Sequence, residues 1–144
     1  MDAQQPLTTM EKIAFLRASP FFASLPLEEL YQVALSVEEE GVKSGESVIR
    51  AGDVGDKMYI AVHGKLEVLR GDGQRLAVLE EKAVFGEMAL IDAEPRSATV
   101  TALEDARLLS LRRDNFERIL RRYSSIAFNT MRILSGRLRE SMGG

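Results

Sequence analysis

The sequence predicts a mainly β protein with helices at both ends, in which seven or eight short strands form a barrel, roll or sandwich. Two observations predict this fold class. Apolar residues recur every three or four positions near both termini, as in amphipathic helices, but alternate with a period of two in the middle of the chain. Glycine-aspartate pairs interrupt the middle region at short intervals, which is typical of strands joined by tight turns.

The first third of the chain is expected to be helical. Residues 10–18 form a periodic segment that ends before Pro20, because proline disfavours a helical conformation in the residue before it. A second helix restarts near Ser24, a candidate N-cap, with Pro26 in its first turn. The apolar stripes predicted for these two helices are Ile13, Phe15 and Leu16, and Leu27, Leu30, Tyr31 and Ala34.

The strands are expected from about Val37 onward. Asp72-Gly73 separates two alternating segments and predicts a hairpin in which both turn residues have positive φ. Two further strands should lie on either side of Glu104-Asp105.

Helical periodicity returns in the last third. Asp114 is a candidate N-cap for the first of two helices, and the second should span residues 125–141. Stripes of this kind usually belong to the core or to a dimer seam. The predicted stripes are Phe116, Ile119, Leu120 and Tyr123, and Ala127, Met131, Leu134 and Leu138, with Arg132, Arg137 and Arg139 pointing away from the second stripe.

Length and composition are those of one globular domain. A chain of 144 residues with 45% hydrophobic residues can bury a self-sufficient core. No apolar run approaches the roughly 18 residues of a membrane span, and the first residues lack a signal-peptide pattern, so we expect a cytoplasmic protein. The absence of cysteine excludes disulfides and thiolate metal sites, and we expect no metal and no cofactor.

The charge is unevenly distributed along the chain. Residues 112–144 contain eight Arg and three acidic residues, a net charge of +5, so the preceding 111 residues carry −8 of the total of −3. A basic tail can bind nucleic acid or an anionic membrane, but we favour a solvated helix face.

The segment FGEMALIDAEPRSATV, residues 85–100, is the most informative part of the sequence. Gly86 lets the backbone approach a ligand because it has no Cβ. If residues 87–90 form one helical turn, their unpaired amides point to a common position, which suits an anion. Arg96 follows Pro95 and precedes small residues, and its guanidinium can bind phosphate oxygens in bidentate fashion. A carboxylate such as that of Glu87 can accept hydrogen bonds from ribose hydroxyls.

This combination describes a nucleotide site with a phosphate and a sugar, but without a metal cluster or a catalytic base. The alternative is a structural ion pair between Arg96 and Glu87. Ser97 has no base in its motif, so nucleophilic catalysis is not expected. His63, the only histidine, should lie at a surface turn, and the simplest interpretation of Met58, Met88 and Met131 is that they are core residues.

Residues 85–100 resemble the phosphate-binding cassette of the cyclic nucleotide-binding domain family, with its pattern F-G-E-aliphatic-small-L, a short loop and P-R-small-A-T-V. The segment AGDVGDKMYIAVHGKLEVLR is similar to the family signature G-D-x-x-D-x-M-Y-I. The resemblance covers nearly the whole chain. It implies one domain, residues 1–144, with N-terminal helices (1–35), an eight-stranded antiparallel, jelly-roll-like β-roll (36–111) that contains the cassette (85–100), and two C-terminal helices (112–144).

The resemblance also implies residue roles. Arg96 would hold the cyclic phosphate, together with the Ser97 hydroxyl and the amides of the turn that begins at Gly86. Glu87 would accept the ribose 2′-hydroxyl, and Ala89 would pack beside the phosphate. The predicted ligand-binding residues are Gly86, Glu87, Met88, Ala89, Arg96, Ser97 and Ala98.

Two positions bear on the details of the ligand site. In the resembling family a threonine at the position of Ser97 accompanies guanine selectivity, so we expect cAMP rather than cGMP here. Ala93 departs from the family, because relatives often have glycine in this loop. If that position requires a positive φ, the loop geometry differs, but the role of Arg96 does not.

We therefore interpret the chain as a cyclic-nucleotide sensor and not as an enzyme. Binding would reposition the C-terminal helices and signal to a partner or to another part of a longer parent protein, and a homodimer through the last helix is compatible with its stripe. No room remains before Gly144 for the helix-turn-helix of the family's transcription factors. Two alternatives stay open: a non-binding roll that serves as an interaction or dimerisation scaffold, and nucleic-acid binding through the Arg-rich helices, which lack a recognisable reader motif.

Overall fold

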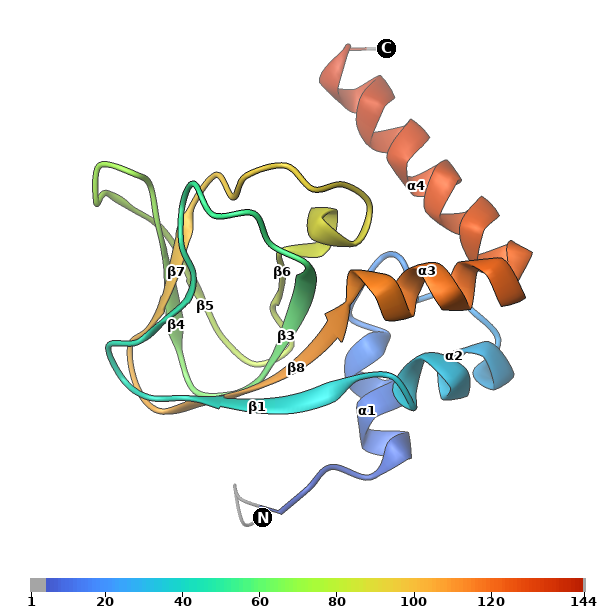
Figure 1. Cartoon of the computed structure of the whole chain (residues 1–144), viewed down its shortest axis with the longest axis horizontal. Helices are drawn as coiled ribbons and strands as arrows, with labels where there is room; N and C mark the ends of the chain where they lie inside the picture. The colour runs from blue at the N-terminus through green and yellow to red at the C-terminus, as the bar shows by residue number, and fades with distance from the viewer. Residues whose placement is uncertain (1–4, 144) are drawn as a thin grey trace.

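The computed structural model describes residues 5–143, and residues 1–4 and 144 of the predicted domain lie outside this range. Within it, eight strands form two four-stranded antiparallel sheets that enclose a roll, and the helices lie together at one side of the roll (Figure 1). The predicted eight-stranded antiparallel β-roll with flanking helices is therefore confirmed.

The element boundaries follow the predicted order. The helices are α1 (Thr9–Leu16), α2 (Leu27–Ala34), α3 (Arg113–Arg122) and α4 (Ser124–Ser141), and one 3₁₀ turn is η1 (Glu87–Leu90). The strands are β1 (Glu38–Val42), β2 (Ser47–Ile49), β3 (Lys57–His63), β4 (Leu66–Leu69), β5 (Arg75–Leu79), β6 (Val84–Phe85), β7 (Thr99–Ala102) and β8 (Ala106–Arg112). One sheet has the strand order β1-β8-β3-β6 and the other β2-β7-β4-β5.

Strand β3 separates two apolar cores. Because successive side chains of a strand point to opposite faces, Met58 and Ile60 pack against the helices, whereas Tyr59 and Ala61 point into the roll. The helical core includes Phe116, whose ring lies 6.3 Å from that of Phe21 and 5.9 Å from that of Phe22. The helices thus cover the outer face of the β1-β8-β3-β6 sheet, and the second core lies inside the roll.

The predicted hairpin joins β4 and β5, but its turn differs from the expectation. Gly73 has a φ of 90°, whereas Asp72 does not have a positive φ. The amide of Arg70 donates to the carbonyl of Gln74 at 2.8 Å, so three residues form the loop. A three-residue loop needs a single left-handed residue, which is the glycine.

The two N-terminal helices begin at different kinds of cap, and the cap predicted for α2 is wrong. Thr8 caps α1 in a capping box, in which its hydroxyl accepts from the Glu11 amide (3.1 Å) and the Glu11 carboxylate accepts from the Thr8 amide (2.9 Å). Ser24 does not cap α2, because the helix begins one residue after Pro26, which takes the N-cap position. The predicted stripe of α2 was also rotated: Leu30, Val33 and Ala34 are buried, whereas Leu27 and Tyr31 are 53% and 45% exposed.

The stripe predicted for α3 is confirmed, whereas that of α4 is divided, with Leu134 packed against the core and two other members exposed. Phe116 and Ile119 of α3 are buried, although Asp114 lies inside the first turn rather than at the N-cap. In α4, Ile126 and Thr130 are buried, whereas Met131 and Leu138 are 53% and 61% exposed. The helix carries apolar residues on two faces, and its contacts with the segment after α1 decide which face is buried, as when Asn129 Nδ2 donates to the Phe21 carbonyl (2.9 Å).

The positions predicted for His63 and Met58 are confirmed, whereas the position predicted for Met88 is wrong. His63 ends β3, is exposed, and precedes Gly64, whose φ is 89°, as expected for a surface turn. Met58 is a core residue, but Met88 is 42% exposed. Among residues 5–143, no helix is both long enough and apolar enough to cross a membrane, and no three His, Cys, Asp or Glu side chains gather around a metal position.

Candidate functional site

The cassette leaves β6 at Gly86, turns through η1 and returns along the loop to β7. Gly86 has a φ of 73°, and η1 forms the single helical turn that the sequence predicts. A Cβ on Gly86 would lie 2.8 Å from Nη1 of Arg96 and 3.2 Å from Cδ1 of Ile49. Glycine is therefore required both by the backbone conformation and by the approach of Arg96.

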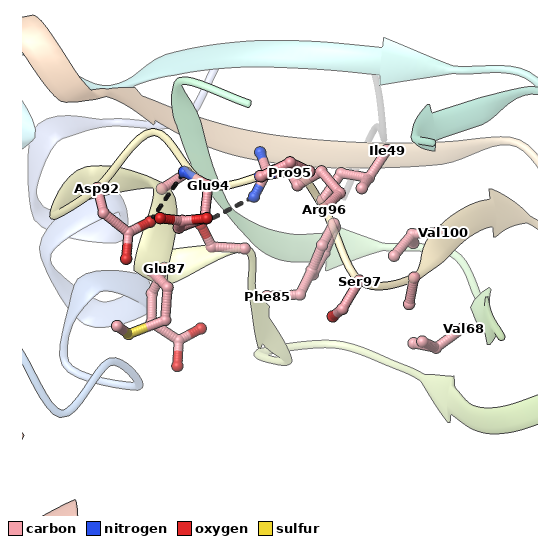
Figure 2. Close-up of a pocket in the computed structure, with 14 residues that line it drawn as sticks. Ile49, Val68, Phe85, Glu87, Asp92, Glu94, Pro95, Arg96, Ser97 and Val100 are labelled. Carbon is pink, nitrogen blue, oxygen red and sulfur yellow. Dashed lines mark hydrogen bonds between the residues drawn. The ribbon is translucent and has the colours of Figure 1, made fainter. Parts of the chain in front are cut away.

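A cavity of about 370 Å³ opens beside the cassette, within the size range of small-molecule sites. Figure 2 shows it between Glu87, on the η1 side, and Val68 and Val100 on the strand side. All seven predicted ligand-binding residues line this cavity: Gly86, Glu87, Met88, Ala89, Arg96, Ser97 and Ala98. Its apolar walls are Ile49, Val68, Phe85 and Val100, and the first two of these lie outside the motif.

Arg96 is a half-buried cation without a carboxylate partner. Its Nη2 donates to the Lys57 carbonyl (2.7 Å) and its Nη1 to the Gly86 carbonyl (3.2 Å). Throughout residues 5–143, no Asp or Glu forms an ion pair with it. Burial lowers the pKa of Arg96, whereas Tyr59 and Asp56 act in the opposite direction. A bound anion would offset this cost of burying the charge.

Glu87 pairs with a different arginine. Its carboxylate lies 3.3 Å from Nη2 of Arg137 on α4, so the structural ion pair between Glu87 and Arg96 that the sequence left open does not form. Nη1 of Arg137 lies 3.6 Å from the Met88 sulfur, and its guanidinium stands 5.4 Å from the centre of the Phe21 ring. Arg137 thus joins α4, the cassette and the segment after α1.

The prediction that Arg137 points away from the packed face of α4 is wrong. Arg137 follows Ile133 by four residues and Thr130 by seven, so it continues the face of α4 that does pack. The phase given by Ile126, Thr130 and Ile133 was the signal that could have found it.

The other cassette residues present small groups to the cavity. The Ser97 hydroxyl makes no hydrogen bond within residues 5–143 and is open to a ligand (Figure 2). Met88, half-exposed, lies at the edge of the cavity rather than in the core. Ala93 does not have a positive φ, so its replacement of the family's glycine introduces no backbone strain.

The second motif lies directly against the cassette. The Gly52 amide donates to the Arg96 carbonyl and the Arg96 amide donates to the Asp53 carbonyl, both at 2.8 Å. Val54 and Pro95 form a single antiparallel bridge between the same two segments. Two segments that are more than forty positions apart in the sequence therefore fix the backbone of Arg96 together.

Comparison with known proteins identifies the family. The model of the cyclic nucleotide-binding domain matches residues 39–123. The cyclic AMP receptor protein of Thermus thermophilus is 35% identical over 131 residues, which cover 88% of this chain and 60% of that protein. This chain therefore spans less than two thirds of that relative.

Solved structures agree with this match. The N-terminal domain of a transcriptional regulator from Streptomyces coelicolor A3(2) has a TM-score of 0.82 at 32% identity, covering 90% of this chain and 93% of that one. The regulatory domain of Toxoplasma gondii PKA, solved with cAMP, has a TM-score of 0.71 at 33% identity, covering 77% of this chain and 44% of that one. The chain belongs to the cyclic nucleotide-binding domain family.

Proposed function

We propose that this domain binds a 3′,5′-cyclic mononucleotide in the cavity beside η1. The observation that carries the proposal is Arg96, a half-buried cation that lines the cavity and forms no ion pair within residues 5–143. The phosphate would complete its coordination, with the Ser97 hydroxyl and the amides of η1 as further donors. The described residues that line the cavity supply groups that can bind a ligand, and we propose a regulatory role rather than catalysis.

The rest of the ligand follows from the neighbouring side chains. Glu87 would accept the ribose 2′-hydroxyl, and the apolar walls formed by Val68 and Val100 offer a surface to the rest of the nucleotide. We propose cAMP as the preferred ligand and no additional cofactor. Two observations support cAMP: Ser97 stands where threonine would favour guanine, and one relative is named for cyclic AMP while one structural neighbour was solved with it.

We propose that ligand binding is transmitted through α4. Glu87 holds Arg137 of α4 in this structure, and the same carboxylate would contact the ribose. A ligand shifts a conformational equilibrium only if it binds the two conformations with different affinity. A carboxylate that serves both Arg137 and the ribose provides such a difference, because the ligand would compete with α4 for Glu87. The output would reach a partner or another part of a longer parent protein, in the cytoplasm.

The outer face of α4 supports a homodimer. Its large apolar side chains are exposed at positions separated by three, seven and four residues, which is a coiled-coil spacing. These residues are Phe128, Met131 and Leu138 of α4 and Met142, which follows its last turn, with exposures of 56%, 53%, 61% and 76%. We propose a second copy of this chain as their partner, and a dimerisation scaffold without ligand is the second candidate function.

Calorimetric titration with cAMP, cGMP and a cyclic dinucleotide tests the proposal. We expect saturable binding of the two mononucleotides, tighter for cAMP, and none of the larger dinucleotide. Absence of heat with every ligand, in a chain that unfolds cooperatively, would leave the scaffold as the better function. Sedimentation at several protein concentrations tests the dimer separately.

A further inference from the structure

Gly55, in the loop between β2 and β3, lies against the guanidinium of Arg96. Its φ is not positive, so the backbone conformation at this position does not require glycine. Space does require it, because a Cβ on Gly55 would overlap with Nε, Cζ and Nη2 of Arg96.

Two glycines border the same guanidinium. Gly86 approaches it at Nη1, and Gly55 covers Nε, Cζ and Nη2. The two hydrogen bonds from Arg96 to the carbonyls of Lys57 and Gly86 fix the orientation of the guanidinium. We call the space bordered by Gly55 and Gly86 the glycine slot.

The loop that carries Gly55 cannot easily move away from Arg96. The backbone of Arg96 exchanges hydrogen bonds with Gly52 and Asp53, both at 2.8 Å, just before Gly55 in the sequence. The guanidinium, by contrast, is the far end of a flexible side chain. A side chain at position 55 would therefore displace the guanidinium before it displaces the loop.

We propose that Gly55 is a positioning residue for the anion-binding guanidinium of Arg96, and this inference rests on the proposed function. Gly55 does not line the cavity in which the nucleotide is proposed to bind. It keeps the slot open, so that Arg96 meets the phosphate already oriented by its two carbonyl contacts. Substitution at position 55 should weaken nucleotide binding with little loss of stability.

The test uses Gly55→Ala and Gly55→Val, with Gly71→Ala as the matched control. Gly71 is also a loop glycine without positive φ, but a Cβ there meets nothing within 4 Å. We expect Gly55→Ala to weaken cAMP binding by about tenfold or more, the size of one charge-assisted hydrogen bond, and Gly55→Val to weaken it further. Gly71→Ala should bind as the parent does. Parent-like affinity in both Gly55 variants would overturn the proposal.

A double-mutant cycle separates positioning from a general structural effect. In an Arg96→Ala background the slot is empty, so Gly55→Ala should cause no further loss of affinity. If Gly55→Ala lowers the unfolding temperature, the variant that combines Gly55→Ala with Arg96→Ala should restore it, because the slot then holds no guanidinium. Equal losses with and without Arg96 would overturn the positioning role.

A readout without ligand keeps this inference separate from the proposed function. The NMR signal of the Arg96 Nε–H, assigned by its disappearance in Arg96→Ala, should shift in Gly55→Ala and stay in place in Gly71→Ala. An unmoved signal would overturn the slot even if the parent binds cAMP. If the signal shifts but the parent chain binds no cyclic nucleotide, the positioning role of Gly55 would stand and the proposed function would be contradicted.

Discussion

Arg96 and Arg107 lie in two regions of the same roll, and the two regions differ in how they compensate the charge of the arginine. Arg107 on β8 has a side chain that is 15% exposed, pairs with the carboxylate of Glu39 on β1, and donates to the Gln5 carbonyl. Arg96 is half-buried, but within residues 5–143 its side chain donates to backbone carbonyls alone. Burying a guanidinium is costly unless a charge compensates it. The protein provides that charge at Arg107, and we infer that a ligand provides it at Arg96.

The two regions also differ in what they hold together. Glu39 accepts a hydrogen bond from the Leu7 amide at 3.0 Å as well as from Arg107, so this ion pair fixes the N-terminal segment against the sheet. Arg96 instead lines an open cavity. In this roll, the buried arginine that pairs with a carboxylate has a structural role. The half-buried arginine that forms no ion pair within residues 5–143 points to ligand binding.

The largest expected effects come from removing each arginine. Arg96→Ala should weaken cAMP binding by roughly 1.5–3 kcal/mol, about 10- to 150-fold, because a charge-assisted contact is lost, and should change stability little. Calorimetric titration and thermal unfolding of the same sample measure both quantities. Unchanged affinity in a folded Arg96→Ala variant would contradict the phosphate assignment.

Arg107→Ala should show the reverse pattern. It leaves the largely buried carboxylate of Glu39 without its cation, and we expect a loss of about 1–3 kcal/mol of unfolding free energy with parent-like cAMP affinity. Denaturant unfolding measures the loss. If Arg107→Ala weakened cAMP binding as much as Arg96→Ala, the distinction between the two regions would fail.

The next effect concerns Glu87. We expect Glu87→Ala to weaken cAMP binding by about 1–2 kcal/mol, because the carboxylate no longer accepts the 2′-hydroxyl. A 2′-deoxy ligand should bind the parent more weakly and should be nearly insensitive to Glu87→Ala. Glu87→Gln is the matched variant, since it keeps an acceptor oxygen but releases the ion pair with Arg137. Equal losses for both ligands would remove Glu87 from the ribose.

The cassette could be predicted from the sequence because its geometry is largely local. A glycine with positive φ, one helical turn and an arginine beside small residues all lie between residues 85 and 100. Alternation and turn residues likewise predicted seven or eight strands, and the resemblance to the family set the number at eight. These features depend on neighbours within a few positions, where sequence patterns determine conformation.

The features that could not be predicted depend on contacts between distant segments. In α4 both faces are apolar, and only the docking of Ile126 and Thr130 shows which face is buried. The contact of Arg137 with Glu87 follows from that choice, across 50 positions of sequence. Gly55 reads as an ordinary turn glycine until the loop is placed against Arg96.

Amide exchange extends the comparison to α4. We expect cAMP to slow exchange across residues 86–98 and across residues 125–141, because Glu87, the proposed partner of the ribose, also pairs with Arg137 of α4. In Arg137→Ala, protection should persist in the cassette and decrease in α4. Protection confined to the cassette in the parent would indicate a binding module in which α4 does not respond.

The smallest effect is expected next to Arg96, at Ser97. Ser97 and Arg96 line the same cavity, but the serine is neutral and its hydroxyl has no partner within the described residues 5–143. Threonine keeps the hydroxyl and adds a methyl group that restricts χ1, so it can hold the hydroxyl in one orientation. A neutral hydrogen bond contributes about 0.5–1.5 kcal/mol, so Ser97→Thr should raise the affinity for cGMP relative to cAMP by about 2- to 12-fold.

Paired titrations of both nucleotides with the parent, Ser97→Thr and Ser97→Ala measure this ratio, and Ser97→Ala should not shift it toward cGMP. Tighter binding of cGMP than cAMP by the parent, or no shift in Ser97→Thr, would contradict the role of Ser97 in base selection while leaving the assignment of Arg96 intact.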